Sequence, residues 1–255
     1  MSRWLKGGYA ASIFLFLYLP LVVVAVFSFN DSRFSLAWHG FTLDWYVRLW
    51  HNTGLMTAAV NSLIIAASAA TLATFLGTIA AFVLHQYRFA GRRLLFGTFF
   101  VMMMSPDIVI AISLLLLFLA LPLNLGFHTL LLAHIVLCVP FVAITVFSRF
   151  HRFQHDVIDA ARDLGASEYQ VFRHIVLPLA APAVAAGWLL SFTLSLDDVI
   201  ISFFNTGPGF EVLPLRIYSM VRLGIRPDVN ALCVAMIVFT IIALILTKIL
   251  LKEKK

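Results

Sequence analysis

Three aspartates lie in otherwise apolar stretches of the chain: Asp107, Asp197 and Asp198. A charge at bilayer depth costs at least ~2.5–3.5 kcal/mol, so carboxylates there usually face a bundle interior or a water-filled path. Carboxylates replace the hydration that a cation loses, and aromatic rings offer it further attractive faces. We therefore expect a path for a cationic substrate. The structural alternative is that an aspartate caps a broken helix or pairs with Arg216 or Arg222.

The depth of these carboxylates follows from helix geometry. Asp107 comes 14 residues after Arg93, or about 20 Å along a helix, near or just beyond the midplane. Pro106 removes a helix hydrogen bond there and opens the backbone, as at transporter binding sites. Asp197 and Asp198 fall in the outer half of another apolar run. Because adjacent helix positions point about 100° apart, we expect one to face the path and the other to pair or cap.

Aromatic and histidine residues are weaker candidates. Trp45 and Tyr46 belong to an aromatic-rich polar segment, residues 30–56, where a helix is expected from about Thr42. We weigh them as aromatics of the substrate path, although anchoring at headgroup level is the more usual role of such rings. His128 and His134 are expected to have hydrogen-bond partners for their ring nitrogens, either at helix ends or inside the helix bundle.

Several classes of chemistry are excluded by what the printed chain lacks. No glycine is followed by lysine, so there is no phosphate loop and no ATP hydrolysis by that chemistry. Cys138 and Cys233 make neither a metal-ligand set nor a disulfide framework. No nucleophile–base pair or histidine cluster accompanies Asp107 or Asp198. We therefore expect a chain that is not an enzyme and that binds no metal or cofactor itself.

The elements that position these residues are membrane helices. Of the 255 residues, 62% are hydrophobic and 12% charged, with a mean hydropathy of +1.00, too apolar for a soluble domain of this size. We expect one all-α polytopic membrane domain, because lipid leaves open backbone groups unsatisfied. The first span is expected to remain as an anchor. Six spans of about 20 residues or more are expected, at residues 9–29, 57–84, 94–120, 128–147, 179–204 and 231–250.

The distribution of basic residues sets the orientation. Of the 18 Lys and Arg residues, those on the outer side under this arrangement would be only Arg33, Arg48, Arg216, Arg222 and Arg226. Cytoplasmic loops carry the excess of Lys and Arg, so both termini and the loop at residues 148–178 are expected in the cytoplasm. The net charge of +6 is then explained by the orientation of the chain in the membrane. A nucleic-acid partner is not needed to account for it.

The cytoplasmic loop contains a polar, helix-forming stretch, residues 159–178. Val157, Ala161 and Leu164 form one apolar stripe, and Gly165 is placed to end that helix. Ser167 with Gln170 predicts a capping box for a second short helix, with its own stripe at Tyr169, Phe172 and Val176. Pattern alone equally allows an ordinary loop that lies against the headgroups.

The order of residues in this stretch resembles the EAA motif of ABC importer permeases. The matching positions are Asp159, Ala160, Ala161, Gly165, Ile175, Leu177 and Pro178. The resemblance implies that the loop is the coupling helix, which docks into a cleft of an ATPase subunit. Asp159 stands where glutamate is usual, so the charge is kept on a shorter side chain.

Further stretches are similar to permeases of polyamine ABC importers. They are residues 30–34, 104–107, 191–199 and 213–232, so the likeness covers nearly the whole chain. It implies the type I ABC importer permease fold, transport of spermidine or putrescine, and the bacterial inner membrane. It also implies partners: a second homologous permease, two ATPase subunits that use ATP and Mg²⁺, and a periplasmic binding protein.

Other functions remain as alternatives. One is the same architecture with another small solute. A second is an autonomous ion-coupled transporter or channel, which predicts internal repeats and no docking loop; no convincing repeat is present. A third is an intramembrane enzyme.

Overall fold

The computed structural model describes residues 3–32, 37–150, 160–161, 163–222, 228–238 and 241. Within these residues the chain is helical, and the sole β-structure is a bridge between Asn30 and Phe41. The all-α expectation is thus confirmed. The chain divides into a central part, Thr57–Leu215, and a terminal part, Met1–Met56 with Arg216–Lys255.

The terminal part contains α1 (Arg3–Phe27), α2 (Asp44–His51), most of α11 (Leu213–Arg222) and a helix at Asp228–Val238. The turn between α1 and α2 is organised by the buried Asn30 side chain. Its amide donates to the Ala37 carbonyl at 2.6 Å and its oxygen accepts from the His39 N–H at 2.8 Å. These bonds fix the start of α2, close to the position that the aromatic pattern predicts.

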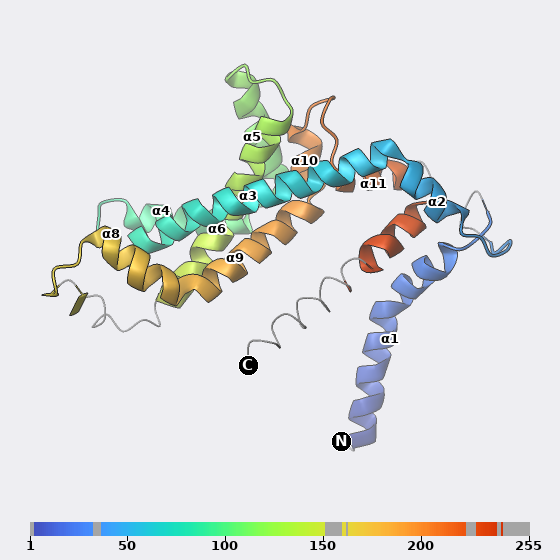
Figure 1. The fold of residues 1–255 in the computed structure, drawn as a ribbon, viewed down its shortest axis with the longest axis horizontal. Coiled ribbons are helices and arrows are strands. Elements are labelled where there is room, and N and C mark those ends of the chain that lie inside the picture. The colour runs from blue at the N-terminus through green and yellow to red at the C-terminus, as the bar shows by residue number, and fades with distance from the viewer. Residues whose placement is uncertain are drawn as a thin grey trace. The chain divides into compact units, whose positions relative to one another are not determined.

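The central part is built around three long helices: α3 (Thr53–Gln86), α6 (Phe127–Phe150) and α9 (Leu177–Asp197). Two shorter helices, α4 (Arg92–Met104) and α5 (Asp107–Ala120), lie between α3 and α6 in sequence. α6 packs along α9, α4 packs on α6, and α10 (Ile200–Asn205) packs against α5 and α6. Figure 1 shows α3, α6 and α9 running together, with α5 turned away from α4.

Small residues let the long helices approach closely. A Cβ added at Gly77 of α3 would lie 2.7 Å from the Val142 Cβ of α6, and one at Gly187 of α9 would lie 3.3 Å from Val142 Cγ1. Small residues at helix interfaces are the usual solution in membranes, where packing replaces the hydrophobic effect between helices. Four alanines of α3 are fully buried and serve the same close packing: Ala66, Ala69, Ala70 and Ala73.

The expected third span, residues 94–120, is two helices that meet at 113°. Ser105 is extended (ψ 139°) and Pro106 follows it with ψ 135°. The residue before a proline is driven out of the helical region, so α4 ends there and α5 restarts at Asp107. A similar break separates α9 from α10, where Asp198 is extended (ψ 128°).

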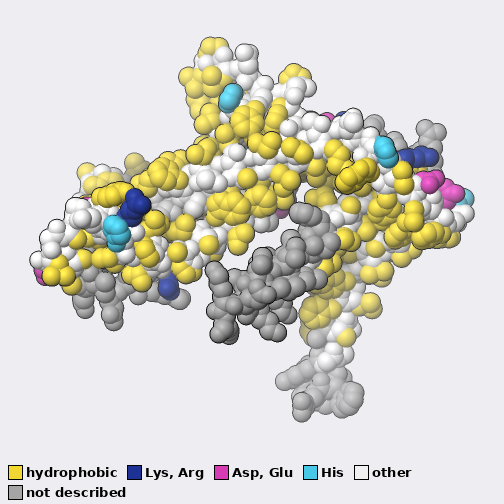
Figure 2. Space-filling view, viewed as in Figure 1, with side chains coloured by type: hydrophobic (Ala, Val, Ile, Leu, Met, Phe, Trp, Pro, Cys, Tyr) yellow, Lys and Arg dark blue, Asp and Glu magenta, His cyan; other side chains and the backbone are white. Residues whose placement is uncertain are grey.

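Four described helices are long and apolar enough to cross a membrane: Gly7–Phe27, Thr53–Gln86, Phe127–Phe150 and Glu168–Asp197. The broken pair α4–α5 makes a fifth if it is one span. The sixth expected span, residues 231–250, begins in the helix Asp228–Val238, and most of its remainder lies outside the described residues. Figure 2 shows hydrophobic side chains over most of the visible surface of each part, with few charges among them.

Candidate functional site

Gly165 ends the first helix of the segment at residues 159–178 by adopting a left-handed conformation, φ +83°. The N–H of Ala166 donates to the carbonyl of Ala161 at 3.0 Å, the bond that closes a Schellman turn. No atom lies within 4 Å of the place where a Cβ would stand. Glycine is therefore required by the backbone conformation and not by lack of space, and its predicted role as the residue after the helix is confirmed.

The second helix of the segment begins with the predicted capping box. Ser167 Oγ accepts from the Gln170 N–H at 3.3 Å, and Gln170 Oε1 accepts from the Ser167 N–H at 2.8 Å. This helix is α8 (Glu168–Val171), and it does not stand as a separate element. It continues through a π-helical turn, η1 (Phe172–Val176), directly into α9, whereas the sequence pattern predicts a separate short helix.

The π-helical turn has a local cause at Pro178. A proline in the first turn of a helix supplies no N–H, so the preceding turn is free to change its hydrogen-bond register. The Leu177 N–H indeed bonds to the carbonyl of Phe172, five residues earlier. Helices α8, η1 and α9 thus form one continuous helical rod within the central part.

The buried side of the segment packs on the ends of α3 and α6. Val171 and Val176 are buried in a cluster with Phe82 and Phe150, and Ala161 packs against it. The Phe172 ring lies 4.9 Å from the Phe82 ring. The sequence stripe identified Ala161, Phe172 and Val176, but it missed Val171 and the receiving surface on α3.

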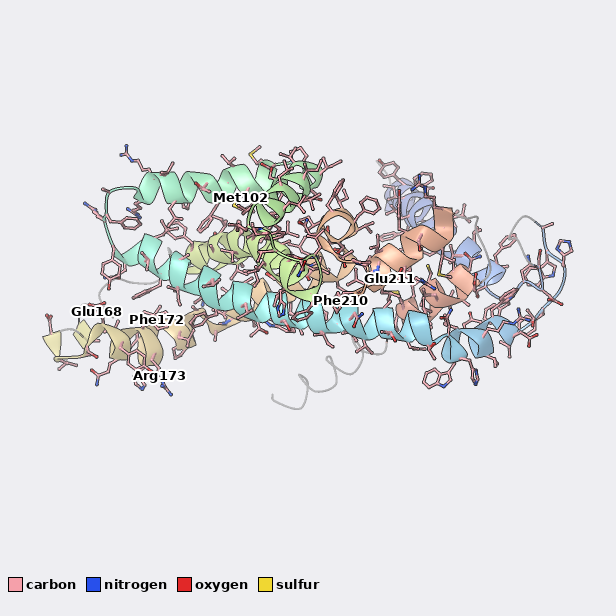
Figure 3. The ribbon with its side chains drawn as sticks, turned by 90° about the horizontal axis from the view of Figure 1, so that it is seen from above. Met102, Glu168, Phe172, Arg173, Phe210 and Glu211 are labelled. Atoms are coloured by element: carbon pink, nitrogen blue, oxygen red, sulfur yellow. The ribbon has the colours of Figure 1, made fainter. Side chains whose placement is uncertain are left out.

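A polar contact joins the segment to α3 as well. Tyr87 Oη donates to Glu168 Oε2 at 3.3 Å. Both residues lie at the protein surface, one just after the end of α3 and the other at the start of α8. Figure 3 labels Glu168 and Phe172 on this segment beside α3. No signal in the sequence links these positions, because they are 81 residues apart.

The opposite side of the segment is exposed. The Leu164 side chain is 89% exposed, and Tyr169 is also exposed while it accepts a 2.8 Å hydrogen bond from Arg173 Nη1. Ala160, Leu177 and Pro178 are exposed too, and Ile175 is half-buried. Asp159, Val157 and Arg162 lie outside the described residues. An exposed leucine and tyrosine on a polar segment offer apolar surface to another molecule.

Asp198 caps α10 from the break that follows α9. Its Oδ1 accepts from the Ile201 N–H at 3.1 Å and its Oδ2 from the Ser202 N–H at 2.7 Å. The side chain is only 6% exposed, and Oδ2 lies 3.6 Å from Nε2 of the buried His134. Asp198 therefore acts as a helix cap, which is the structural alternative considered from the sequence. The side chain close to its carboxylate is His134 and not Arg216 or Arg222.

His134 is the centre of a buried polar network between α6, α9 and α10. Its Nδ1 shares a 2.5 Å hydrogen bond with Ser195 Oγ, and its Nε2 lies 3.2 Å from Ser202 Oγ. The expectation of a satisfied bundle histidine is confirmed. The two serines were missed, because serines in an apolar run carry no sequence signal of their partners.

Asn205 and Thr129 tie α10 to its neighbours. The Asn205 amide donates to the Ala111 carbonyl of α5 at 3.2 Å, and Thr129 Oγ1 of α6 donates to the Asn205 carbonyl at 2.9 Å. Both side chains are buried. The short helix α10 is thereby held between α5 and α6, which fixes the break at Asp198 next to the start of α5.

Asp107 and Asp197 are the exposed members of the acidic group. Asp107 begins α5, and Asp197 ends α9. Asp197 interacts electrostatically with both Asp198 and Asp107. The two helix breaks therefore place Asp197 within electrostatic range of both other predicted carboxylates. Within the described residues no group of three His, Cys, Asp or Glu side chains has a geometry for a metal ion.

Trp45 and Tyr46 lie in the terminal part. Trp45 is 8% exposed, and its Nε1 donates to the Asn30 carbonyl at 2.9 Å. The Arg48 guanidinium lies 5.0 Å from the centre of its ring. Tyr46 Oη lies 2.7 Å from Ser28 Oγ. Both aromatic side chains thus have partners within this part.

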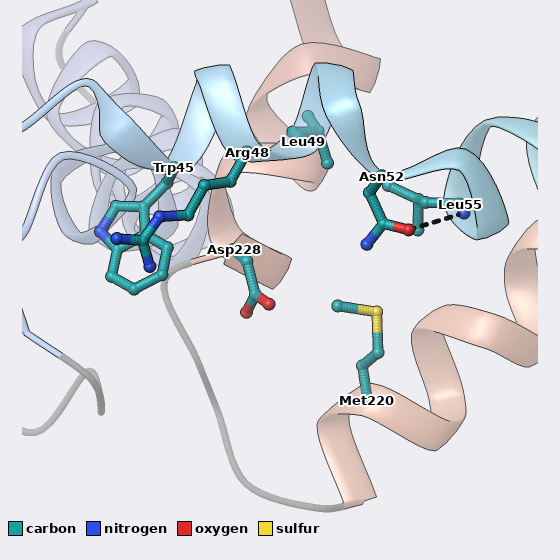
Figure 4. A pocket seen from close by; sticks show the side chains of 7 residues that line it. All are labelled: Trp45, Arg48, Leu49, Asn52, Leu55, Met220 and Asp228. Carbon is teal, nitrogen blue, oxygen red and sulfur yellow. Dashed lines mark hydrogen bonds between the residues drawn. The ribbon is translucent and has the colours of Figure 1, made fainter.

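A pocket of about 170 Å³ adjoins the Trp45 ring in the same part. Figure 4 shows Arg48 stretched over Trp45 and the Asp228 carboxylate directed into the same space. Asn52 closes another side, where its Oδ1 accepts from the Leu55 N–H at 3.1 Å. The aromatic face of Trp45 is already occupied by Arg48, which weakens it as a partner for a substrate cation.

Comparison with known proteins gives near full-length relatives. The chain is 50% identical over 254 residues to the spermidine/putrescine transport system permease protein PotC of Escherichia coli (strain K12), with 100% of this chain and 96% of the relative covered. It is 47% identical to the protein of that name from Haemophilus influenzae, covering 99% of each. The putrescine transport system permease protein PotI of E. coli K12 is 42% identical over 86% of this chain and 80% of its own length.

Solved structures agree on the fold. A chain of a bacterial ABC transporter involved in the import of the acidic polysaccharide alginate superposes with a TM-score of 0.75 at 20% identity, covering 97% of this chain and 98% of that one. A chain of the MetNI methionine ABC transporter gives 0.61 at 15% identity, over 77% and 95%. The family described as the inner membrane component of binding-protein-dependent transport systems matches residues 73–253. The chain belongs to this family of transport-system membrane components.

Proposed function

We propose that the chain is the permease subunit of an ATP-driven importer that carries polyamines, spermidine or putrescine, across the bacterial inner membrane. The observation that carries this proposal is the 50% identity over the whole chain to a spermidine/putrescine permease. The three carboxylates gathered at two helix breaks support a cationic substrate. The permease itself forms and breaks no covalent bond.

The coupling part of the proposal rests on the segment at residues 159–178. Its buried side is fixed to α3 and α6 by Val171, Val176 and the Phe82–Phe172 contact. Its exposed side carries Ala160 and Leu164, which are available to a partner. Closure of an ATPase dimer on this side would move α8, η1 and α9 together. That motion reaches the break at Asp198, because α9 ends there.

The substrate path is proposed at Asp107 and Asp197. Both are exposed at helix breaks, where a protonated amine of the substrate would replace hydration with carboxylate contacts. Asp198 acts differently: it accepts two backbone N–H groups and holds the break in shape. Trp45 and Tyr46 are proposed only as path aromatics of the terminal part, since each already has a partner.

The assembly contains a second homologous permease, two ATPase subunits that bind ATP and Mg²⁺, and a periplasmic polyamine-binding protein. This chain binds no cofactor and no nucleic acid. Both of its termini are cytoplasmic, as the bias of Lys and Arg indicates. The choice between spermidine and putrescine depends in part on the binding protein.

Uptake in cells tests the proposal. Cells that lack their own polyamine importers are given the complete assembly and labelled spermidine or putrescine. We expect ATP-dependent accumulation that excess unlabelled polyamine suppresses and a neutral solute such as glucose does not. Uptake that a neutral solute suppresses equally, or an assembled complex without polyamine uptake, would refute the substrate assignment.

A further inference from the structure

At the loop between α3 and α4, a basic cavity adjoins an apolar groove. The cavity, of about 640 Å³, is lined by residues 88–93, which include Arg88, Arg92 and Arg93. The groove, of about 280 Å³, is lined by Arg92 and Arg93 together with Leu84, Phe96 and Phe147. Because Arg92 and Arg93 line both, the two spaces adjoin. Dark blue side chains mark this end of α4 in Figure 2.

One of the three arginines, Arg92, is held in place by a hydrogen bond, and none of them is neutralised by a described carboxylate. Arg92 Nε donates to the Leu84 carbonyl at 2.8 Å, which fixes its stem against the end of α3. Among the described residues no carboxylate lies within ion-pair distance of Arg88, Arg92 or Arg93. The N-terminus of α4, at Gly91 and Arg92, adds its positive dipole end to the same place.

We propose that this cavity and groove bind one anionic phospholipid of the inner leaflet. The phosphate would lie among the three guanidinium groups, and an acyl chain would follow the groove along Phe96 and Phe147. Basic pockets between helices at the cytoplasmic boundary are suited to such headgroups. A soluble anion leaves the apolar groove unused, and an acidic peptide has no acyl chain to fill it. The inner-leaflet position rests on the orientation in the proposed function.

Native mass spectrometry of the complete purified assembly tests the site with phosphatidylglycerol as the probe and phosphatidylethanolamine as the neutral comparison. The test variant is Arg88→Gln/Arg93→Gln, which retains the Arg92 bond to Leu84. Arg222→Gln, an exposed arginine of α11, is the matched control. A basic side chain near an anionic surface contributes roughly fivefold in affinity. We expect phosphatidylglycerol binding about 20-fold weaker in the double variant and unchanged in the control.

A second variant tests the groove. Phe96→Trp fills it without changing charge, and we expect it to weaken phosphatidylglycerol binding while inorganic phosphate binding stays as it was.

Unchanged phosphatidylglycerol affinity in Arg88→Gln/Arg93→Gln would overturn the site. An effect of the arginines but none of Phe96→Trp would overturn the lipid in favour of a free anion. Loss of the ATPase subunits from the double variant, with lipid retained, would make the site a protein contact. None of these outcomes bears on polyamine transport, which the assay does not measure.

Discussion

His134 Nε2 lies 3.6 Å from Asp198 Oδ2 inside the central part, where both side chains are almost fully buried. The same carboxylate holds the first turn of α10 through two backbone N–H groups. One buried contact therefore links α6 to the break between α9 and α10. The neighbouring Asp197 is exposed, so the two adjacent aspartates have different roles: Asp198 caps α10, and Asp197 is open to solvent.

The first prediction separates these two roles by stability. Asp198→Asn turns one oxygen into a donor that faces a backbone N–H, and we expect a loss of about 1–3 kcal/mol. Asp197→Asn removes an exposed charge and should leave stability within about 0.5 kcal/mol. Thermal melting of the purified assembly measures both. Equal melting temperatures for Asp198→Asn and wild type would contradict the capping role.

The second prediction concerns the bend at Gly165 and the proposed role of this segment in ATPase docking. Gly165→Ala places a Cβ in a left-handed conformation at a cost of about 1–2 kcal/mol, although space is available. Gly165→Asn should cost less, because asparagine tolerates this conformation. We expect ATPase association to fall in the order glycine, asparagine, alanine, as measured by co-purification. Equal association for all three would show that the bend is not needed for docking.

The third prediction distinguishes docking from folding within the segment. Leu164 is exposed, whereas Val171, seven residues later, is fully buried. Leu164→Asp should reduce co-purification of the ATPase while the permease pair keeps its melting temperature. Val171→Asp should lower the melting temperature itself, since it buries a charge. A Leu164→Asp permease that binds the ATPase normally would place the docking surface elsewhere.

The fourth prediction concerns helix packing. Gly77→Ala would put a Cβ 2.7 Å from Val142 Cβ, and we expect a loss of about 1–3 kcal/mol through overpacking. Gly97→Ala on α4 is the control, because nothing lies within 4 Å of its Cβ position. Val142→Gly combined with Gly77→Ala should lose less than the sum of the two single losses, because it removes the Val142 Cβ that the added methyl group meets. Thermal melting that ranks Gly97→Ala as more harmful than Gly77→Ala would contradict the packing.

Local signals in the sequence predicted local structure well. Ser167 with Gln170, Gly165 and Pro106 each act through bonds or sterics within five residues, and each has its predicted effect. The partners of Asp198 could not be predicted, because His134 is far away in sequence and only the packing of α6 against α9 brings it near. The merging of α8 with α9 was missed because a proline such as Pro178 more often marks the first turn of a separate helix than a change of hydrogen-bond register within a continuous one.

The sharpest measurement of the transport path is the initial rate of labelled spermidine uptake into proteoliposomes that contain the complete assembly, its binding protein and ATP on the ATPase side. The variants are Asp107→Asn, Asp197→Asn and the control Asp44→Asn at the exposed start of α2. We predict uptake at least tenfold slower for the first two, with melting temperature and ATPase association unchanged, and normal uptake for the control. Wild-type rates in both Asp107→Asn and Asp197→Asn would contradict a path for cations along these carboxylates.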